Sequence, residues 1–186
     1  MADDRDLLMA VRAARQRLQE VGPTNERAKG DFNEVSLPLA DCDVLRDVLL
    51  AEGARVVIEI GLAYGSSALA IGEALVSEGS AGARHVIVDA FQGAFHDAGW
   101  EVLRAAGLTD LCTLVVERSQ VALPHLVSEH LLADAAFVDG SHIFHNVFVD
   151  LCFLRELVRP GGLIILDDCE WPSVAAAVRY FELNTA

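Results

Sequence analysis

Five short apolar runs, each separated from the next by a helical pattern, constrain the fold of this chain more than any other feature. The runs are rich in β-branched residues and occupy residues 56–60, 85–89, 113–116, 135–139 and 163–167. Helical patterns cover residues 66–78, 97–106, 120–132 and 144–158 between them, and residues 173–183 after the last run. Apolar strands joined by helices form a parallel sheet that is covered on both faces. The sequence therefore predicts a doubly wound, mainly parallel α/β fold.

The residues before the first run predict a helical N-terminal part. Apolar residues recur at helical spacing over residues 5–20, and a second helix is predicted over residues 41–52. Residues 22–38 break the pattern with several glycines and prolines. We expect residues 1–38 to form a helix with a lid-like segment, and residues 39–186 to form the main domain. The length of 186 residues suits one compact domain.

The charge of the chain excludes several classes of partner. Twenty-eight acidic residues face 14 basic ones, which gives a formal net charge of −14. Phosphate backbones and anionic membrane surfaces repel such a surface, so we expect no nucleic acid and no membrane partner. No apolar run reaches the roughly 18 residues of a membrane span. Four scattered cysteines and an acidic start predict a cytoplasmic protein with reduced thiols.

Acidic residues end three of the predicted strands. Asp89, Asp139 and Asp167 each follow the last apolar residue of a run. Ligands of such sheets bind beyond the carboxyl ends of the strands. One such Asp could simply cap the next turn. Three of them at the same edge favour a ligand site.

A glycine turn follows the first predicted strand. It reads Glu59-Ile60-Gly61-Leu62-Ala63-Tyr64-Gly65-Ser66-Ser67 and leads directly into a helix. Glycines here let a ligand approach the backbone, and Ser66 or Ser67 is expected to cap the helix. A dinucleotide fingerprint would need glycine where Ala63 stands. A nicotinamide-dependent oxidoreductase is therefore the weaker alternative.

Three segments carry a resemblance to a known family. Glu59-x-Gly61-x-x-x-Gly65 resembles motif I of the class I S-adenosylmethionine-dependent methyltransferases. Residues 137–142 resemble the DG(D/S)H segment of a bacterial O-methyltransferase subgroup, and residues 159–168 resemble the family's RPGG turn and fifth strand. The similarity extends from about residue 36 to residue 183. It implies S-adenosyl-L-methionine as the cofactor and a hydroxyl of a small molecule as the methyl acceptor.

The resemblance also implies a set of cofactor contacts. Asp89 would accept hydrogen bonds from both ribose hydroxyls, and Asp139 would close the methionine side. Glu59 would order the glycine turn or reach the ammonium group through water. Phe91 would stack near the adenine, with Ser119 and Gln120 beside its edge. The full set is Glu59, Gly61, Ala63, Tyr64, Gly65, Ser66, Asp89, Phe91, Ser119, Gln120 and Asp139.

Two histidines near the fourth strand are candidates for proton transfer. His142 lies three residues after Asp139, and His145 lies three residues further on, so a helix would place both histidines on one side. An unperturbed imidazole, with a pKa near 6.5, can remove a proton at neutral pH. The resemblance implies that His142 is the base and that Asp139 belongs to the same catalytic group; a polar cap of the next helix is the alternative for His142. The other histidines are read as surface or packing residues: His85, His96, His125 and His130.

Three acids raise the question of a metal. Related catechol-type enzymes hold Mg²⁺ with an acid after the fourth strand and an Asp-Asn pair after the fifth. This resemblance implies Mg²⁺ at Asp139, Asp167 and Asp168, and carboxylates are ligands that hard cations accept. Alternatively, Asp168 caps the turn toward Trp171.

The predicted elements stop short of the family's complete sheet. That sheet ends in an antiparallel strand pair, and no such pair is predicted after residues 173–183. An open sheet edge is often covered by another chain, so we expect a homo-oligomer. The same feature leaves a second hypothesis open, namely a non-catalytic cofactor-binding or dimerisation module.

Overall fold

A parallel sheet of five strands forms the centre of the protein. The computed structural model describes residues 3–28 and 30–185. The strands are β1 (Val56–Ile60), β2 (Arg84–Val88), β3 (Cys112–Val115), β4 (Ala133–Val138) and β5 (Val158–Leu166). They lie in the order β3-β2-β1-β4-β5, and every neighbouring pair is parallel. The predicted doubly wound α/β fold is confirmed.

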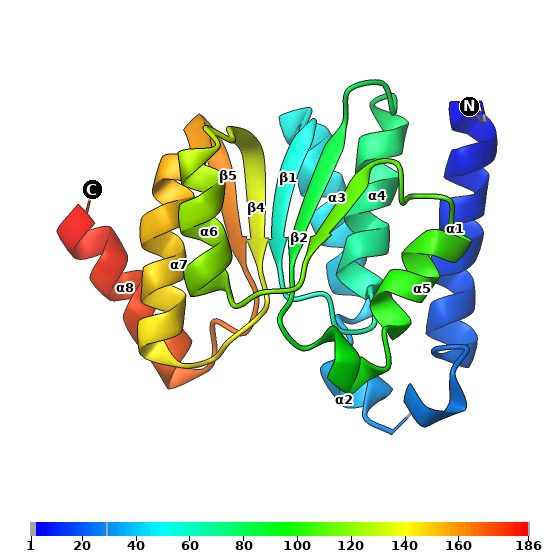
Figure 1. The fold of residues 1–186 in the computed structure, drawn as a ribbon, viewed down its shortest axis with the longest axis horizontal. Helices are drawn as coiled ribbons and strands as arrows, with labels where there is room; N and C mark the ends of the chain where they lie inside the picture. The colour runs from blue at the N-terminus through cyan, green and yellow to red at the C-terminus, as the bar shows by residue number, and fades with distance from the viewer. Residues whose placement is uncertain (1–2, 29, 186) are drawn as a thin grey trace.

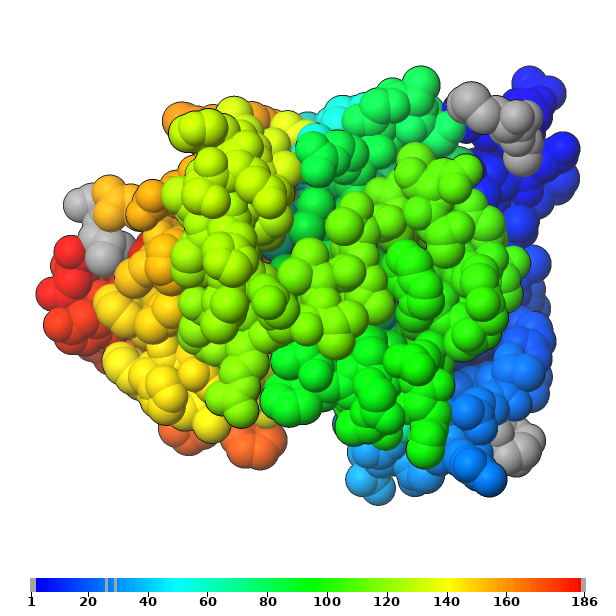
Figure 2. Space-filling view, viewed as in Figure 1, coloured from blue at the N-terminus to red at the C-terminus, as the bar shows by residue number. Residues whose placement is uncertain are grey.

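Helices cover both faces of this sheet (Figure 1). Helices α1, α3, α4 and α5 pack on one face, and α6, α7 and α8 pack on the other. In the space-filling view, α6, α7 and the chain around α5 cover most of the sheet (Figure 2). No helix in the described residues is long and apolar enough to cross a membrane. The helices are α1 (Asp4–Val21), α2 (Phe32–Val35), α3 (Leu39–Glu52), α4 (Ser66–Ser77), α5 (Ala98–Ala105), α6 (Ser119–Ser128), α7 (Phe144–Leu157) and α8 (Pro172–Thr185), with the 3-10 turns η1 (Glu26–Ala28) and η2 (Gln92–Phe95).

The last strand begins earlier than its sequence pattern predicts. Strand β5 starts at Val158 and includes the Arg159–Gly162 segment, which was expected to be a turn before the strand. The register against β4 shifts between Ala133 and Ala135, and this irregularity accommodates the extra residues. A Cβ atom on Gly162 would lie 2.4 Å from the carbonyl oxygen of Asp134. Within the described part of the chain, no strand follows β5.

The segment between α1 and α3 packs against the glycine turn. Phe32 is buried, and its ring meets the ring of Tyr64 edge to face, with centroids 5.3 Å apart. The Tyr64 hydroxyl donates a hydrogen bond to Asp31, and Phe95 contacts the same ring from another side at 5.2 Å. This segment therefore lies beside the carboxyl edge of the sheet, at the bottom of Figure 1. Its role as a lid stays a prediction.

The glycine turn touches the end of β4 through Gly61. Gly61 has φ +96°, and a Cβ atom there would lie only 2.1 Å from the carbonyl oxygen of Asp139. The Gly61 amide donates to Val88, and the Asp139 amide donates to Ile60. The ends of β1, β2 and β4 are thus joined where the strand order reverses, which is where ligands bind in such sheets.

A row of polar side chains in contact with one another crosses the apolar core beneath this turn. Glu59 and His85 are buried, and His85 Nε2 lies 2.9 Å from Glu59 Oε2. Ser67 donates to Glu59 Oε1 at 2.5 Å, and Cys112 Sγ lies 3.8 Å from His85 Nδ1. Burial alone would lower the pKa of His85, but the contacts with Cys112 and Glu59 raise it to about 9. These four side chains thus connect β1, α4, β2 and β3.

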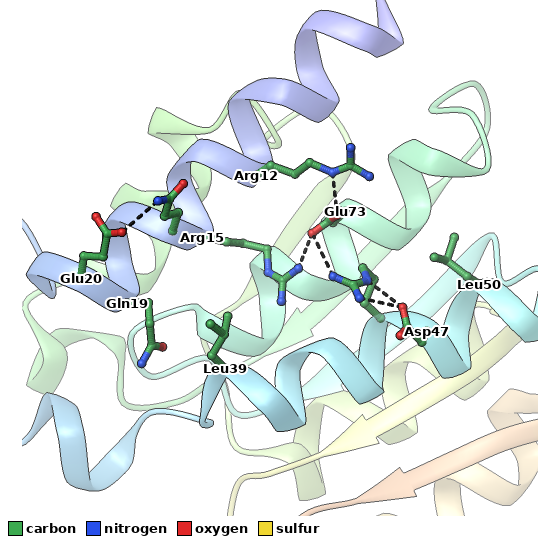
Figure 3. Close-up of a pocket in the computed structure, with 10 residues that line it drawn as sticks. Arg12, Arg15, Gln19, Glu20, Leu39, Asp47, Leu50 and Glu73 are labelled. Carbon is green, nitrogen blue, oxygen red and sulfur yellow. Dashed lines mark hydrogen bonds and ion pairs between the residues drawn. The ribbon is translucent and has the colours of Figure 1, made fainter.

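A second buried carboxylate ties α1 to the rest of the fold. Glu73 on α4 accepts hydrogen bonds from Arg12 and Arg15 of α1, and Arg46 of α3 approaches it to 3.8 Å. Arg15 also reaches Asp43 of α3 at 2.8 Å. Figure 3 shows Arg12 and Arg15 converging on Glu73 within a groove of about 780 Å³. Charged side chains of both signs line the groove, and two of its acids, Glu73 and Asp47, already pair with its arginines.

Replacing Gly61 with Ala should destabilise the protein far more than a matched change at Gly82. Both glycines have positive φ, but nothing lies within 4 Å of a Cβ atom at Gly82. We expect Gly82→Ala to cost about 1–2 kcal/mol of unfolding free energy, from the backbone conformation alone. Gly61→Ala must also push the Asp139 backbone away, so it should cost at least about 2 kcal/mol more. Urea denaturation measures both, and equal losses would contradict the close contact.

The His85–Glu59 pair should make stability fall at alkaline pH. The pKa of His85 rises from 6.5 to about 9 on folding, so in this range the folded state keeps a proton that the unfolded state has lost. The contribution of the pair is complete below pH 6.5 and disappears as the pH rises through about 9. Unfolding free energies of the wild type and His85→Gln should therefore converge across this window. An NMR titration of His85 with a midpoint near or below 6.5 would contradict this prediction.

Candidate functional site

The carboxylate of Asp89 organises the glycine turn from the end of β2. Its Oδ2 accepts hydrogen bonds from the Leu62 and Ala63 amides at 3.0 and 3.1 Å, and from Gln92 Nε2 at 2.9 Å. Among the described residues, its Oδ1 accepts only from the Phe91 amide, at 2.6 Å. Because Oδ2 is saturated, Oδ1 is the oxygen with room for a further donor. Asp89 as a whole is only 7% exposed.

The glycine turn presents its backbone rather than its side chains to the carboxyl edge. Ala63 has φ +41°, and Gln92 holds its carbonyl oxygen at 2.9 Å. The Tyr64 side chain is buried against the segment before α3, so only its backbone remains for a ligand. The expectation that Ser66 or Ser67 caps α4 is wrong. Gly65 is the N-cap residue, and Ser67 is turned inward to Glu59.

Glu59 lies beneath the turn and has no exposed side-chain surface. Ser67 and His85 contact its two carboxylate oxygens from inside the core. Of the two roles weighed for Glu59, this position favours ordering the turn over reaching an ammonium group.

The three residues expected at an adenine lie near the same edge but differ in exposure. The ring of Phe91 follows β2 and is exposed. Ser119 begins α6 and is buried, and Gln120 beside it is half-buried. Figure 1 shows that α6 begins at the end of the sheet where the glycine turn lies.

Asp139 is the carboxyl group with the most perturbed environment at this edge. Burial raises its pKa to about 8, with further contributions from the charges of Asp167, Asp168 and Glu59. Burial and the charge of Asp168 also raise the pKa of Asp167. A cation placed among these acids would relieve the repulsion between them. The edge is therefore suited to a positively charged ligand.

His142 lies between Asp168 and an aromatic ring. Its Nε2 atom lies 2.5 Å from Asp168 Oδ2, and its ring stacks on Trp171 with centroids 5.1 Å apart. The imidazole remains 39% exposed, so a ligand can reach it. His145, which was expected on the same side, is exposed on α7. The turn to Trp171 is closed by the carbonyl oxygen of Asp168, which leaves the Asp168 carboxylate for His142.

Three ligand atoms gather close enough to hold a metal ion. Asp139, His142 and Asp168 each offer one atom, and these atoms lie within 4.8 Å of one another. A small cavity of about 10 Å³, enough for roughly one water or ion, adjoins them. Asp167 lines this cavity, but its carboxylate is not part of the group. The residues fit a divalent cation with His142 in the place expected for Asp167.

Two residues that shape the site were missed by the sequence analysis. Gln92 is buried and links Asp89 to the Ala63 carbonyl, and its position three residues after Asp89 was the available signal. His85 was read as a surface or packing residue, and the structure places it in the core against Glu59. No local pattern predicts that pairing, because it joins two different strands.

Comparisons with known proteins agree with this geometry. The model of a methyltransferase domain family matches residues 58–169, more than half of the chain. The chain is 25% identical to the caffeoyl-CoA O-methyltransferase of Populus kitakamiensis over 167 residues, which are 87% of this chain and 66% of that protein. It spans less than two thirds of the length of the curated relatives that it matches.

Solved structures show the same fold. An O-methyltransferase from Bacillus cereus, solved in complex with SAH, superposes with a TM-score of 0.68 at 18% identity, covering 96% of this chain and 87% of that one. TomG from Streptomyces achromogenes, solved with SAM, gives 0.70 at 22% identity, covering 94% and 76%. With the family model matched across β1 to β5, this chain belongs to the methyltransferase domain family.

Proposed function

We propose that the protein binds S-adenosylmethionine at the carboxyl edge of its sheet and transfers the methyl group to a hydroxyl of a small molecule. The observation that carries this proposal is the Asp89 carboxylate, which holds the glycine turn open beside the point where the strand order reverses. The relatives named O-methyltransferases support the choice of acceptor atom.

Different residues of the chain bind different parts of the cofactor. Asp89 Oδ1 accepts a ribose hydroxyl, while Oδ2 keeps the turn in shape. The backbone of residues 61–65 lies against the amino-acid part of the cofactor, and the acids around Asp139 attract its sulfonium. Bound S-adenosylmethionine would supply an activated methyl group, which is attached to its sulfonium.

His142 supplies the base for the acceptor. Asp168 holds its Nε2 atom and Trp171 fixes the plane of its ring, so the Nδ1 atom is left to take the proton of an acceptor hydroxyl. We propose that a divalent cation competes with this arrangement for Nε2, since Asp139, Asp168 and His142 can also act together as ligands. Such an ion would lower the pKa of a bound hydroxyl.

Replacing Asp89 with Asn should weaken cofactor binding more than tenfold. An Asn oxygen can still accept from the Leu62 and Ala63 amides, but its amide group then faces Phe91 and the ribose with donors instead of an acceptor. Calorimetric titration with S-adenosylhomocysteine measures the effect, with Asp110→Asn at the other end of the sheet as the control. Absence of binding to the wild type, or a thermal shift with NAD⁺ instead, would overturn the proposed function.

His142→Ala should lower turnover while leaving the affinity for S-adenosylhomocysteine nearly unchanged.

The same variant should lose the thermal shift that Mn²⁺ causes in the wild type, because an imidazole with two carboxylates suits Mn²⁺ better than Mg²⁺. Asp6→Asn, which removes one charge from α1, serves as the control for the overall field. A Mn²⁺ shift that survives in His142→Ala would restrict the ligands to the carboxylates. Cofactor binding without turnover on any hydroxyl acceptor would identify a non-catalytic module.

A further inference from the structure

The side chain of Tyr64 joins the glycine turn to a segment that lies about thirty residues earlier in the chain. This segment comprises residues 31–37, which include helix α2, and is called the α2 segment below. Tyr64 is only 3% exposed. Its hydroxyl donates a hydrogen bond to Asp31, and its ring meets the Phe32 ring with centroids 5.3 Å apart. One residue of the turn thus makes a polar and an apolar contact with the α2 segment.

The same ring also contacts the 3-10 turn η2 on another side. Phe95 of η2 meets the Tyr64 ring at 5.2 Å, again edge to face. Turn η2 also carries Gln92, whose side-chain amide donates to the Ala63 carbonyl oxygen and to Asp89. The Tyr64 ring is therefore packed between the α2 segment and the turn that holds the glycine-turn backbone. Because protein interiors are closely packed, displacing one neighbour of this ring affects the others.

The hydrogen bond between Tyr64 and Asp31 opposes any opening of the α2 segment. Burial raises the pKa of Tyr64 to about 12, with a further contribution from Asp31, so at neutral pH the hydroxyl keeps the proton that it donates. Hydrogen bonds to a charged acceptor are stronger than those between neutral groups. If the α2 segment moved away from the turn, this bond and the contact with the Phe32 ring would be lost together.

The α2 segment has few other contacts to hold it in place. Phe32 and Leu37 are its buried side chains, and the other residues are exposed or half-buried. Segments with little buried apolar surface open locally at a lower free energy than the core. A ligand that needs the glycine turn in its packed shape binds the closed segment more tightly than the opened one. It must then suppress opening by the same factor by which closure raises its affinity.

We propose that Tyr64 is a positioning residue through which the α2 segment sets the affinity for the cofactor. The inference rests on the proposed function, which places the cofactor against the backbone of residues 61–65. Tyr64 acts from behind that backbone, because its side chain is buried between Phe32 and Phe95. Cofactor binding in turn holds the α2 segment closed.

Hydrogen exchange of the α2 amides, followed by NMR, tests this coupling. The Glu34 and Val35 amides donate to the Asp31 carbonyl oxygen. The Ser36 amide donates to the Phe32 carbonyl oxygen. Exchange of these amides requires local opening, so saturating S-adenosylhomocysteine should slow it at least about fivefold in the wild type. Absence of binding would refute the proposed function itself, whereas binding with unchanged exchange would refute only the role of the α2 segment.

Variants of the hydrogen bond separate positioning from packing. Tyr64→Phe keeps the ring and removes the hydroxyl, so the affinity for S-adenosylhomocysteine, measured by calorimetry, should fall at least about threefold. The slowing of α2 exchange by the ligand should shrink by a similar factor. Asp31→Ala should have the same effect, and the double variant should lose no more. Asp31→Asn keeps an oxygen that accepts from the hydroxyl, so it should retain most of the affinity.

The second tyrosine of the chain provides the matched control. Tyr180 lies exposed on α8, and Tyr180→Phe makes the same chemical change there. This variant should change neither the affinity nor the exchange of the α2 amides. A Tyr64→Phe protein with a lowered melting temperature but with wild-type affinity and exchange response would overturn the proposal, because Tyr64 would then contribute to stability alone.

Discussion

The close contact between Gly61 and the Asp139 carbonyl is the constraint on which the rest of the site depends. With any side chain at Gly61, the turn after β1 and the end of β4 could not approach as they do. Because they touch, the backbone of the glycine turn and the acids that follow β4 belong to one rigid unit. The amide bonds from Gly61 to Val88 and from Asp139 to Ile60 extend this unit across three strands.

The acids of this edge fall into two groups with different physical roles. Glu59 and Asp89 are contacted by groups inside the protein, so their charges help to maintain the shape of the glycine turn. Burial raises the pKa of Asp139, and the charges of Asp167 and Asp168 raise it further. The formal charge of −14 by itself indicated only a surface that repels anionic partners. The crowding of these three carboxyl groups indicates where a bound cation would be stabilised.

The fold was largely predictable because its three central strands, β2, β1 and β4, are buried on both faces and their sequences are therefore mostly apolar. All five strands and the main helices lie close to their expected positions. The start of β5 was missed, since Arg159-Pro160-Gly161-Gly162 is typical of a turn, and its pairing with β4 involves a register shift that the sequence does not indicate. In the site, residue types at strand ends could be read directly. The inward turn of Ser67, the burial of Tyr64 and the pairing of His85 depend on contacts between distant segments, which no local pattern records.

The arginines around Glu73 indicate that the main domain depends on the N-terminal helix α1 for its stability. Arg12 and Arg15 belong to α1, and Glu73 lies buried on α4, the helix that the glycine turn opens. A chain cut after residue 38 would keep every strand and every residue proposed to touch the cofactor. It would also take from Glu73 its two nearest counter-charges, Arg12 and Arg15, and expose the apolar face of α4 that α1 covers. The N-terminal helix α1 thus supplies the counter-charges of a buried acid. The chain needs this helix in order to fold, although none of the residues proposed to contact the cofactor belongs to it.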